Sequence, residues 1–150
     1  MQTEHEFTIT VQVGEPGDIG AGPGGLRRFI PAASGTVTGD RIRGRLRTGG
    51  GDWLLAGPDG FATTDMRYVL ETEDGALIYL QGRGVVEMND AMQRALGEGV
   101  PTEFADHYVR TTFVLETGDE RYAWVNRTVF LSQTRFTPGP AVEYSVERVL

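Results

Sequence analysis

Apolar and polar residues alternate with a period of two along much of this chain of 150 residues. The clearest case is the segment from Glu6 to Val13, where Phe7, Ile9 and Val11 fall on one face of an extended strand. Turn residues interrupt the alternating runs, because 21 glycines and 7 prolines are spread along the sequence. The side chains of a strand project alternately to its two faces, so each run predicts a strand with one buried face. The pattern therefore predicts an all-β protein.

The boundaries of the runs predict where the strands lie. Asp74 and Gly75 between two runs are a strong hairpin signal. One helix is predicted at 89–97, with Asn89 as its N-cap and Gly97 as its C-cap. The glycine-rich segment 14–25 is predicted to be a loop, because no phosphate-binding ending and no helix pattern follow it. Besides 6–13, strands are predicted at 35–39, 40–48, 52–55, 62–72, 76–87, 108–116, 121–133 and 142–149.

These elements predict a single domain over residues 1–150. An antiparallel sheet of about eight to nine strands usually closes on itself or folds over. The predicted fold is a closed antiparallel β-barrel of about eight to nine strands with one short helix.

Composition excludes several classes of function. Cysteine is absent, and the two histidines, His5 and His107, lack the paired spacing of a metal site. No Gly-x-Ser-x-Gly segment is present, which argues against a hydrolase triad. The net charge of −7 argues against nucleic acid or an anionic membrane as a partner. The polar N-terminus and the lack of a long apolar run predict a cytoplasmic protein without a signal peptide or membrane span.

Segment 121–130 concentrates side chains that can hold a small molecule. Tyr122, Trp124 and Asn126 share one face of the strand predicted there, and the opposite face is mostly apolar. Neighbouring predicted strands each carry a mostly aliphatic face and a mixed aromatic and polar face. The mixed faces contain Asp65, Arg67 and Val69, then Leu77, Tyr79, Gln81 and Arg83, and then Tyr108, Arg110, Thr112 and Val114.

Two arrangements satisfy this pattern. Either the aliphatic faces fill the barrel and the mixed faces meet water, or the mixed faces line a cavity. We favour the cavity, because an exposed group of aromatic side chains is a costly apolar surface. A few polar groups among aromatic ones are also typical of ligand pockets. If the mixed faces point inward, the aliphatic faces lie on the outside of the barrel and need a cover. This predicts a homodimer or higher homo-oligomer that associates through Ile78, Leu80, Val109, Phe113 and Leu115.

Six short motifs occur in order along the chain, and together they resemble a known family. They are Gly-Leu-Arg-Arg-Phe-Ile-Pro, Gly-Gly-Asp-Trp, Asp-Met-Arg-Tyr, Asp-Gly-Ala-Leu-Ile-Tyr, Tyr-Val-Arg-Thr and Arg-Tyr-Ala-Trp-Val-Asn-Arg. On these motifs the chain resembles, from about Phe7 to Val149, the bacterial and fungal domain-of-unknown-function family numbered three-two-three-seven. It departs from the family pattern at Ala32–Ala33 and at 112–116, so a ligand of one member need not serve another.

The resemblance implies a small closed antiparallel barrel of the calycin or allene-oxide-cyclase type. Such barrels commonly hold hydrophobic small molecules, and some are cofactor-free cyclases. The positions that match the family motifs are Arg27, Arg28, Asp52, Trp53, Asp65, Arg67, Tyr68, Tyr108, Arg110, Tyr122, Trp124 and Asn126.

The available chemistry is acid–base and electrostatic work by carboxylates, phenols and guanidinium groups. We predict no metal and no cofactor. Asp65 and Arg67 could equally form a surface ion pair. The predicted catalytic residues are Asp52, Asp65, Tyr108 and Arg110, and the predicted substrate-binding residues are Trp53, Arg67, Tyr79, Tyr122, Trp124 and Asn126.

Three functions are compatible with these residues. The favoured one is a cofactor-independent cyclase, isomerase or lyase acting on an unsaturated or aromatic carbonyl metabolite inside the barrel. The alternative is a non-catalytic, lipocalin-like carrier or sensor of a hydrophobic metabolite. The third is an assembly protein that uses its aromatic face as an interface.

Overall fold

The computed structural model describes all 150 residues and contains ten strands, one α-helix and one 3-10 helix. The elements are β1 (Thr3–Val13), β2 (Gly17–Gly22), β3 (Gly25–Gly39), β4 (Arg43–Leu46), β5 (Gly51–Ala56), β6 (Phe61–Thr72), β7 (Leu77–Glu87), α1 (Asp90–Glu98), β8 (Val109–Glu116), η1 (Glu120–Arg127), β9 (Phe130–Thr137) and β10 (Ala141–Val149).

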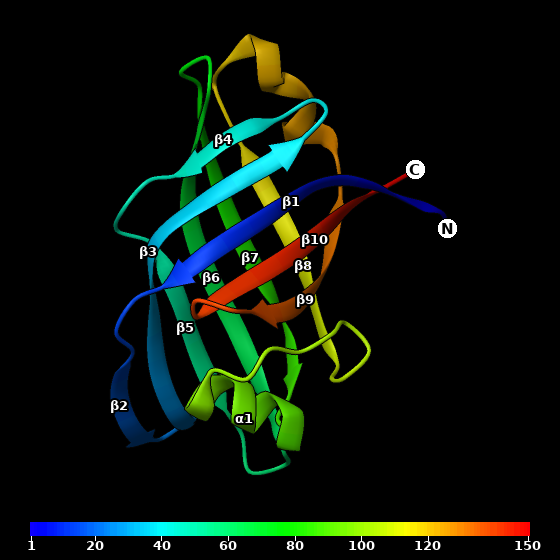
Figure 1. Ribbon diagram of the computed structural model, residues 1–150. Coiled ribbons are helices and arrows are strands. Elements are labelled where there is room, and N and C mark those ends of the chain that lie inside the picture. The colour runs from blue at the N-terminus through cyan, green and yellow to red at the C-terminus, as the bar shows by residue number, and fades with distance from the viewer.

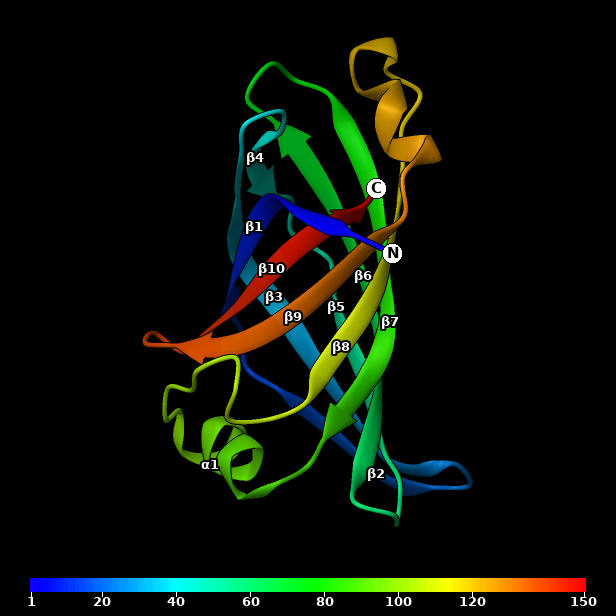
Figure 2. The same cartoon turned by 90° about the vertical axis from the view of Figure 1, so that its right-hand side faces the viewer.

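The strands form a closed antiparallel ring, as the sequence predicts. β1 pairs with β10 on one side and with β3 on the other, which closes the order β10-β9-β8-β7-β6-β4-β3. β5 follows β4 in the same gap, because it also pairs with β3 and β6. The result is a barrel of eight strands with two extra strands, which is more strand than predicted. Figures 1 and 2 show α1 at one end of this barrel and η1 at the other.

Two local predictions are confirmed. β6 and β7 form the hairpin at Asp74 and Gly75, and Thr72 and Ala76 bond to each other across it. The side chain of Asn89 caps α1 by accepting a hydrogen bond from the backbone of Met92. The helix continues beyond Gly97 to Glu98, however, and its C-cap is Gly99, whose φ of 69° suits glycine.

Two predictions about local structure are wrong. The predicted loop at 14–25 contains β2, which pairs with the beginning of β3 as a hairpin. The first part of the predicted strand at 121–133 is η1, so the protein has two short helices. Asp119 explains the change, because its side chain accepts hydrogen bonds from the backbone and the guanidinium of Arg121 and starts a helical turn.

The aliphatic faces of the strands point into the barrel, so the predicted inward position of the mixed faces is wrong. Residues alternate between buried and exposed along β6, β7 and β8, and the exposed positions are those of the mixed faces. The outer positions can carry aromatic residues because the neighbouring long polar side chains keep this surface mixed. The aliphatic residues of the predicted interface, Ile78, Leu80, Val109, Phe113 and Leu115, are all buried. That argument for a homo-oligomer therefore fails, and the association state stays a prediction.

The end of the barrel next to η1 is solid. Phe130 is fully buried between Phe7 and Trp124, with ring centroids 5.8 and 6.1 Å away. The guanidinium of Arg41 stacks on Trp124 at 3.7 Å and binds both carboxylate oxygens of Glu6, at 2.7 and 2.6 Å. A cluster of inclined aromatic rings and a paired carboxylate thus close this end.

No helix of the protein has the length and the apolar character needed to cross a bilayer.

Candidate functional site

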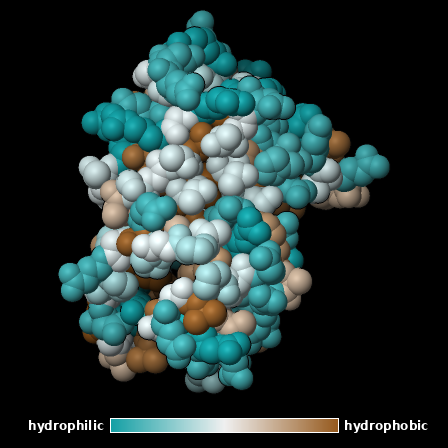
Figure 3. All heavy atoms as spheres, viewed as in Figure 1, coloured by the Kyte–Doolittle hydropathy of each residue, from teal (hydrophilic) through white to brown (hydrophobic).

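A cavity of about 580 Å³ occupies the end of the barrel that α1 covers. Its volume lies within the range of roughly 300–1,000 Å³ that is usual for small-molecule sites. Of the 26 residues that line it, 14 are hydrophobic, so it suits a mainly apolar ligand. The hollow is visible in the lower half of the molecule in Figure 3, in the area that β2 and α1 flank in Figure 1.

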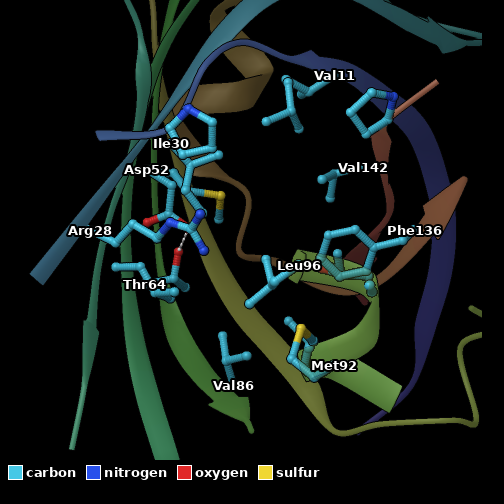
Figure 4. A pocket seen from close by; sticks show the side chains of 18 of the residues that line it. Val11, Arg28, Ile30, Asp52, Thr64, Val86, Met92, Leu96, Phe136 and Val142 are labelled. Atoms are coloured by element: carbon cyan, nitrogen blue, oxygen red, sulfur yellow. Dashed lines mark hydrogen bonds between the residues drawn. The ribbon is translucent and has the colours of Figure 1, made fainter. Parts of the chain in front are cut away.

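One wall of the cavity comes from the inner faces of β3, β5 and β6. Strand alternation brings Arg28 and Ile30 to the inside of β3, and Ile30 pairs with Asp52 of β5. Asp52 in turn pairs with Met66 of β6. Figure 4 shows Arg28, Asp52 and Thr64 together on this side of the cavity.

The opposite wall is apolar. α1 turns Met92 and Leu96 toward the barrel, where they lie near Phe136, and Ala95 and Val109 also line the cavity. Met92 and Val109 belong to a small hydrophobic cluster apart from the main core, and Leu96 and Phe136 pack against it. The cavity exists because α1 covers the barrel opening without filling it.

Asp52 is the polar centre of the site. Its carboxylate accepts hydrogen bonds from the Thr64 hydroxyl at 2.5 Å and from the backbone N–H of Asp65 at 3.1 Å. Burial raises the pKa of Asp52 from 3.8 to about 6, although both hydrogen bonds oppose this shift. No guanidinium lies within salt-bridge distance of the carboxylate. Asp52 can therefore gain or lose a proton near neutral pH.

Two phenols complete the polar part of the cavity. Tyr68 and Tyr144 are both buried, and both line the cavity at its boundary with the main core. Burial raises the pKa of each phenol well above 10. The nearby carboxylate of Asp52 raises the pKa of Tyr68 further, and Tyr68 followed by Asp52 raises the pKa of Tyr144 further. Both phenols therefore stay protonated at neutral pH and can donate hydrogen bonds to a ligand oxygen.

Arg28 supplies the positive charge of the cavity lining. Its side chain is 32% exposed, and its one ionic partner is Asp18, at 3.4 Å between Nε and Oδ1. The Nε atom is buried and has no hydrogen-bond partner.

No group of three or more His, Asp or Glu side chains is placed to share a metal ion.

Of the predicted site residues, Asp52 is the one that lines the cavity. Asp65 lies on the outer face of β6 and forms exposed ion pairs at 3.7 Å with Arg67 and with Arg83 of β7. This is the surface ion pair that was the alternative interpretation of Asp65 and Arg67.

The other predicted strand residues also lie outside. Tyr79 is exposed on β7, and Tyr108 is exposed beside Arg110, whose guanidinium lies 5.1 Å from the ring. Trp53 neighbours Asp52 in β5 and therefore points to the opposite face, where its ring lies 4.8 Å from that of Phe29.

The residues of η1 serve the closed end of the barrel. The Tyr122 hydroxyl donates to Asp74 at 2.8 Å, and Trp124 lies under Arg41. Asn126 bonds to both the N–H and the C=O of Thr117, at 2.9 and 3.0 Å. These side chains attach η1 to the barrel and do not reach the cavity.

Sequence reasoning missed several cavity residues as site candidates. Arg28 and Tyr68 were among the positions matching the family motifs, so the motifs held a usable signal. Tyr68 also stands out as a phenol on an aliphatic inner face of β6. Tyr144, Thr64, Met92 and Leu96 had no comparable signal, because only closure of the ring and docking of α1 bring them to the cavity.

The chain is similar in sequence to proteins named UPF0311. A UPF0311 protein of Clostridium acetobutylicum is 34% identical over 135 residues, covering 87% of this chain and 84% of its own length. A UPF0311 protein of Rhodopseudomonas palustris is 31% identical over 131 residues, covering 87% and 86%. The crystal structure of a conserved Rhodopseudomonas palustris protein of unknown function matches with a TM-score of 0.87 at 30% identity, over 99% of this chain and 97% of that one.

A more distant structure has the same fold. A protein described as an enzyme from Penicillium herquei matches with a TM-score of 0.69 over 99% of this chain and 94% of its own, at 17% identity. The model of the family described as "Protein of unknown function (DUF3237)" matches residues 1–149. The family resemblance of the short motifs is therefore confirmed, and this chain belongs to the DUF3237 family.

Proposed function

We propose that this protein is a cofactor-independent isomerase, cyclase or lyase that moves a proton within an apolar carbonyl compound held in the cavity. The observation that carries the proposal is the carboxylate of Asp52, which has no cationic partner on the wall of an apolar cavity. A protein that needed only stability would gain from a neutral side chain there, because an unpaired carboxylate is costly to bury. Perturbed carboxylates in cavities are typical of acid–base catalysts.

The arrangement suggests a division of roles. A substrate carbonyl would accept a hydrogen bond from Tyr68 or Tyr144, which places a neutral donor where negative charge develops. Asp52 would remove a proton next to that carbonyl and return it to another atom of the same molecule. Its pKa of about 6 suits both steps at neutral pH. The apolar wall from α1 would orient the hydrocarbon part and exclude water.

A carrier or sensor is the second candidate. It is supported by the hydrophobic majority of the cavity lining, which would hold an apolar metabolite without any reaction. The Penicillium herquei protein described as an enzyme indicates that the fold is compatible with catalysis. At 17% identity, the likeness supports the shared fold and not a shared reaction.

Hydrogen–deuterium exchange at carbon separates the two functions. The protein is incubated in D₂O with β-tetralone, an apolar bicyclic ketone with exchangeable protons beside its carbonyl, and incorporation is followed by NMR. An enzyme should accelerate incorporation, and Asp52→Asn should lower the acceleration by about a hundredfold or more while binding persists. Asp40→Asn, in an exposed turn, is the matched control and should exchange like the wild type.

A carrier would bind β-tetralone and leave the exchange rate at that of buffer. Equal acceleration by the wild type and Asp52→Asn would remove Asp52 from the reaction and contradict the proposal.

A further inference from the structure

Arg28 differs from the other arginines in the hydrogen bonding of its guanidinium group. The buried Nε atom of Arg28 is the one arginine nitrogen that is enclosed without a hydrogen-bond partner. Arg41 at the other end of the barrel binds both oxygens of Glu6, and Arg135 binds Glu143 at 3.0 Å. Buried donors without partners are rare in proteins, so this one requires an explanation.

The ion pair with Asp18 does not supply that explanation. Asp18 lies opposite Arg28 in the β2–β3 hairpin, but its side chain is 79% exposed and its oxygen is 3.4 Å from Nε. A solvated pair of this kind contributes little to stability. Asp18 therefore leaves most of the binding capacity of the guanidinium free.

The surroundings of Arg28 favour a ligand anion as its partner. Leu54 lies directly across from Arg28 and Ile30 lies two residues along, so the guanidinium borders an apolar part of the wall. Charge-assisted hydrogen bonds are strongest where water is excluded, and a guanidinium matches the two oxygens of a carboxylate. A bound anion would thus form stronger hydrogen bonds with Arg28 than the exposed carboxylate of Asp18 does.

The register also places this charge relative to Asp52. Asp52 pairs with Ile30, so Arg28 is its diagonal neighbour on the same inner face. Such neighbours are separated by roughly 7–8 Å in a sheet. A molecule anchored at Arg28 would present atoms a few bonds from its charged group to Asp52, and its apolar remainder to Met92, Leu96 and Phe136.

We propose that the cavity takes an apolar molecule bearing one carboxylate, or an equally acidic oxygen group, and that Arg28 binds this group. The inference rests on the proposed function in that it names the substrate class of the same site. It makes the substrate an amphiphile with its charge at the β3 wall and its hydrocarbon part under α1.

The test compares two probes of equal shape and different charge, β-naphthoate and β-naphthamide, by titration calorimetry. The wild type should bind the naphthoate more tightly than the amide. Arg28→Gln should weaken naphthoate binding about tenfold or more and change naphthamide binding by less than about twofold. Arg28→Lys, which keeps the charge but loses the fork of donors, should recover part of the affinity. Arg127→Gln, on an exposed residue of η1, is the control and should bind both probes like the wild type.

Each other outcome has a distinct meaning. Unchanged naphthoate affinity in Arg28→Gln, or an equal loss for both probes, would overturn the assignment of Arg28. Failure of both probes to bind the wild type would overturn this proposal, whereas deuterium exchange of β-tetralone would still decide the proposed function. Charge-dependent binding without any deuterium exchange of β-tetralone would support the anion site and contradict only the catalytic role.

Discussion

Each end of the barrel holds one largely enclosed carboxylate, and the two carboxylates are treated in opposite ways. Glu6, at the end that η1 closes, binds Arg41 through two hydrogen bonds and lies 3.2 Å from Arg148. Asp52, at the end that α1 covers, receives hydrogen bonds from neutral donors and no cation. The first arrangement neutralises a charge and fixes the strands around it, whereas the second leaves a charge ready to react.

The comparison separates structural from functional use of the same residue types. Tyr122, Trp124 and Arg41 at the closed end have partners within the protein. Tyr68, Tyr144 and Arg28 at the open end face a cavity. An aromatic and polar composition therefore does not distinguish a site from a structural cluster, but unsatisfied bonding capacity at a cavity does.

The largest expected effect comes from opening the closed end. Phe130→Ala removes a fully buried ring between Phe7 and Trp124, and it should lower the free energy of unfolding by about 3–5 kcal/mol. Denaturant unfolding measures the loss, and Val129→Ala, on an exposed neighbour, is the control. Below its unfolding temperature, Phe130→Ala should still bind β-tetralone. Loss of binding in the folded variant would show that the two ends are not independent.

The next effect tests the paired carboxylate. Glu6→Gln keeps the shape of the side chain but removes its charge, so the guanidinium groups of Arg41 and Arg148 lose their shared anion. We expect a loss of about 2–3 kcal/mol in the free energy of unfolding, since hydrogen bonds between charged groups contribute on this scale. The loss should be smaller than for a fully enclosed pair, because both arginines reach water. A neutral result would mean that the pair contributes nothing to the closed end.

The unpaired carboxylate should respond with the opposite sign. The pKa of Asp52 is about 6 in the folded protein and near 3.8 when unfolded, so between these values the folded state binds more protons. Stability therefore falls as the pH rises through this window, and the full cost, up to about 3 kcal/mol, is present above pH of about 6. Asp52→Asn should stabilise the protein by up to this amount above pH of about 7 and have little effect below about pH 3. Denaturant unfolding of both proteins across this pH range measures the difference. Destabilisation by Asp52→Asn at high pH would contradict the description of Asp52 as an unpaired carboxylate in the cavity.

The smallest effect belongs to the outer face. Arg67→Gln removes a solvated ion pair with Asp65 that is 3.7 Å long, so the free energy of unfolding should change by less than about 0.5 kcal/mol. Its binding of β-naphthoate should equal that of the wild type. A clear loss of ligand affinity would show that Arg67 contributes to the binding site and that the outer face of β6 has a role in binding.

The sequence predicts the architecture well, because alternation and turn residues are local signals. The hairpin at Asp74 and Gly75, the capping by Asn89 and the closure of the sheet all follow from such signals. Alternation does not say which face is inside, since Tyr79 and Tyr68 occupy opposite faces of neighbouring strands in equally regular patterns. In segment 120–127 the capping by Asp119 overrides the alternation and produces η1.

The candidate site was less accessible to sequence reasoning. Asp52 could be predicted from the chemistry that a barrel interior needs, but its partners come from distant strands. Tyr144 of β10 approaches Asp52 only when the ring closes, and Leu96 only when α1 docks. Their place in the cavity is a property of the tertiary structure and leaves no local pattern.

The pairing of β1 with β10 has a consequence for how the protein is made. Thr3 lies opposite Val149, so β1, which is synthesised before the other strands of the ring, has to pair with β10, which is synthesised after them. Until then β1 has one of its two ring neighbours, β3, and the inner faces of the sheet remain accessible to other nascent chains. Contacts between residues so distant in sequence slow folding, typically to milliseconds or seconds. The cavity, which β10 helps to line, is therefore completed only after β10 has been synthesised.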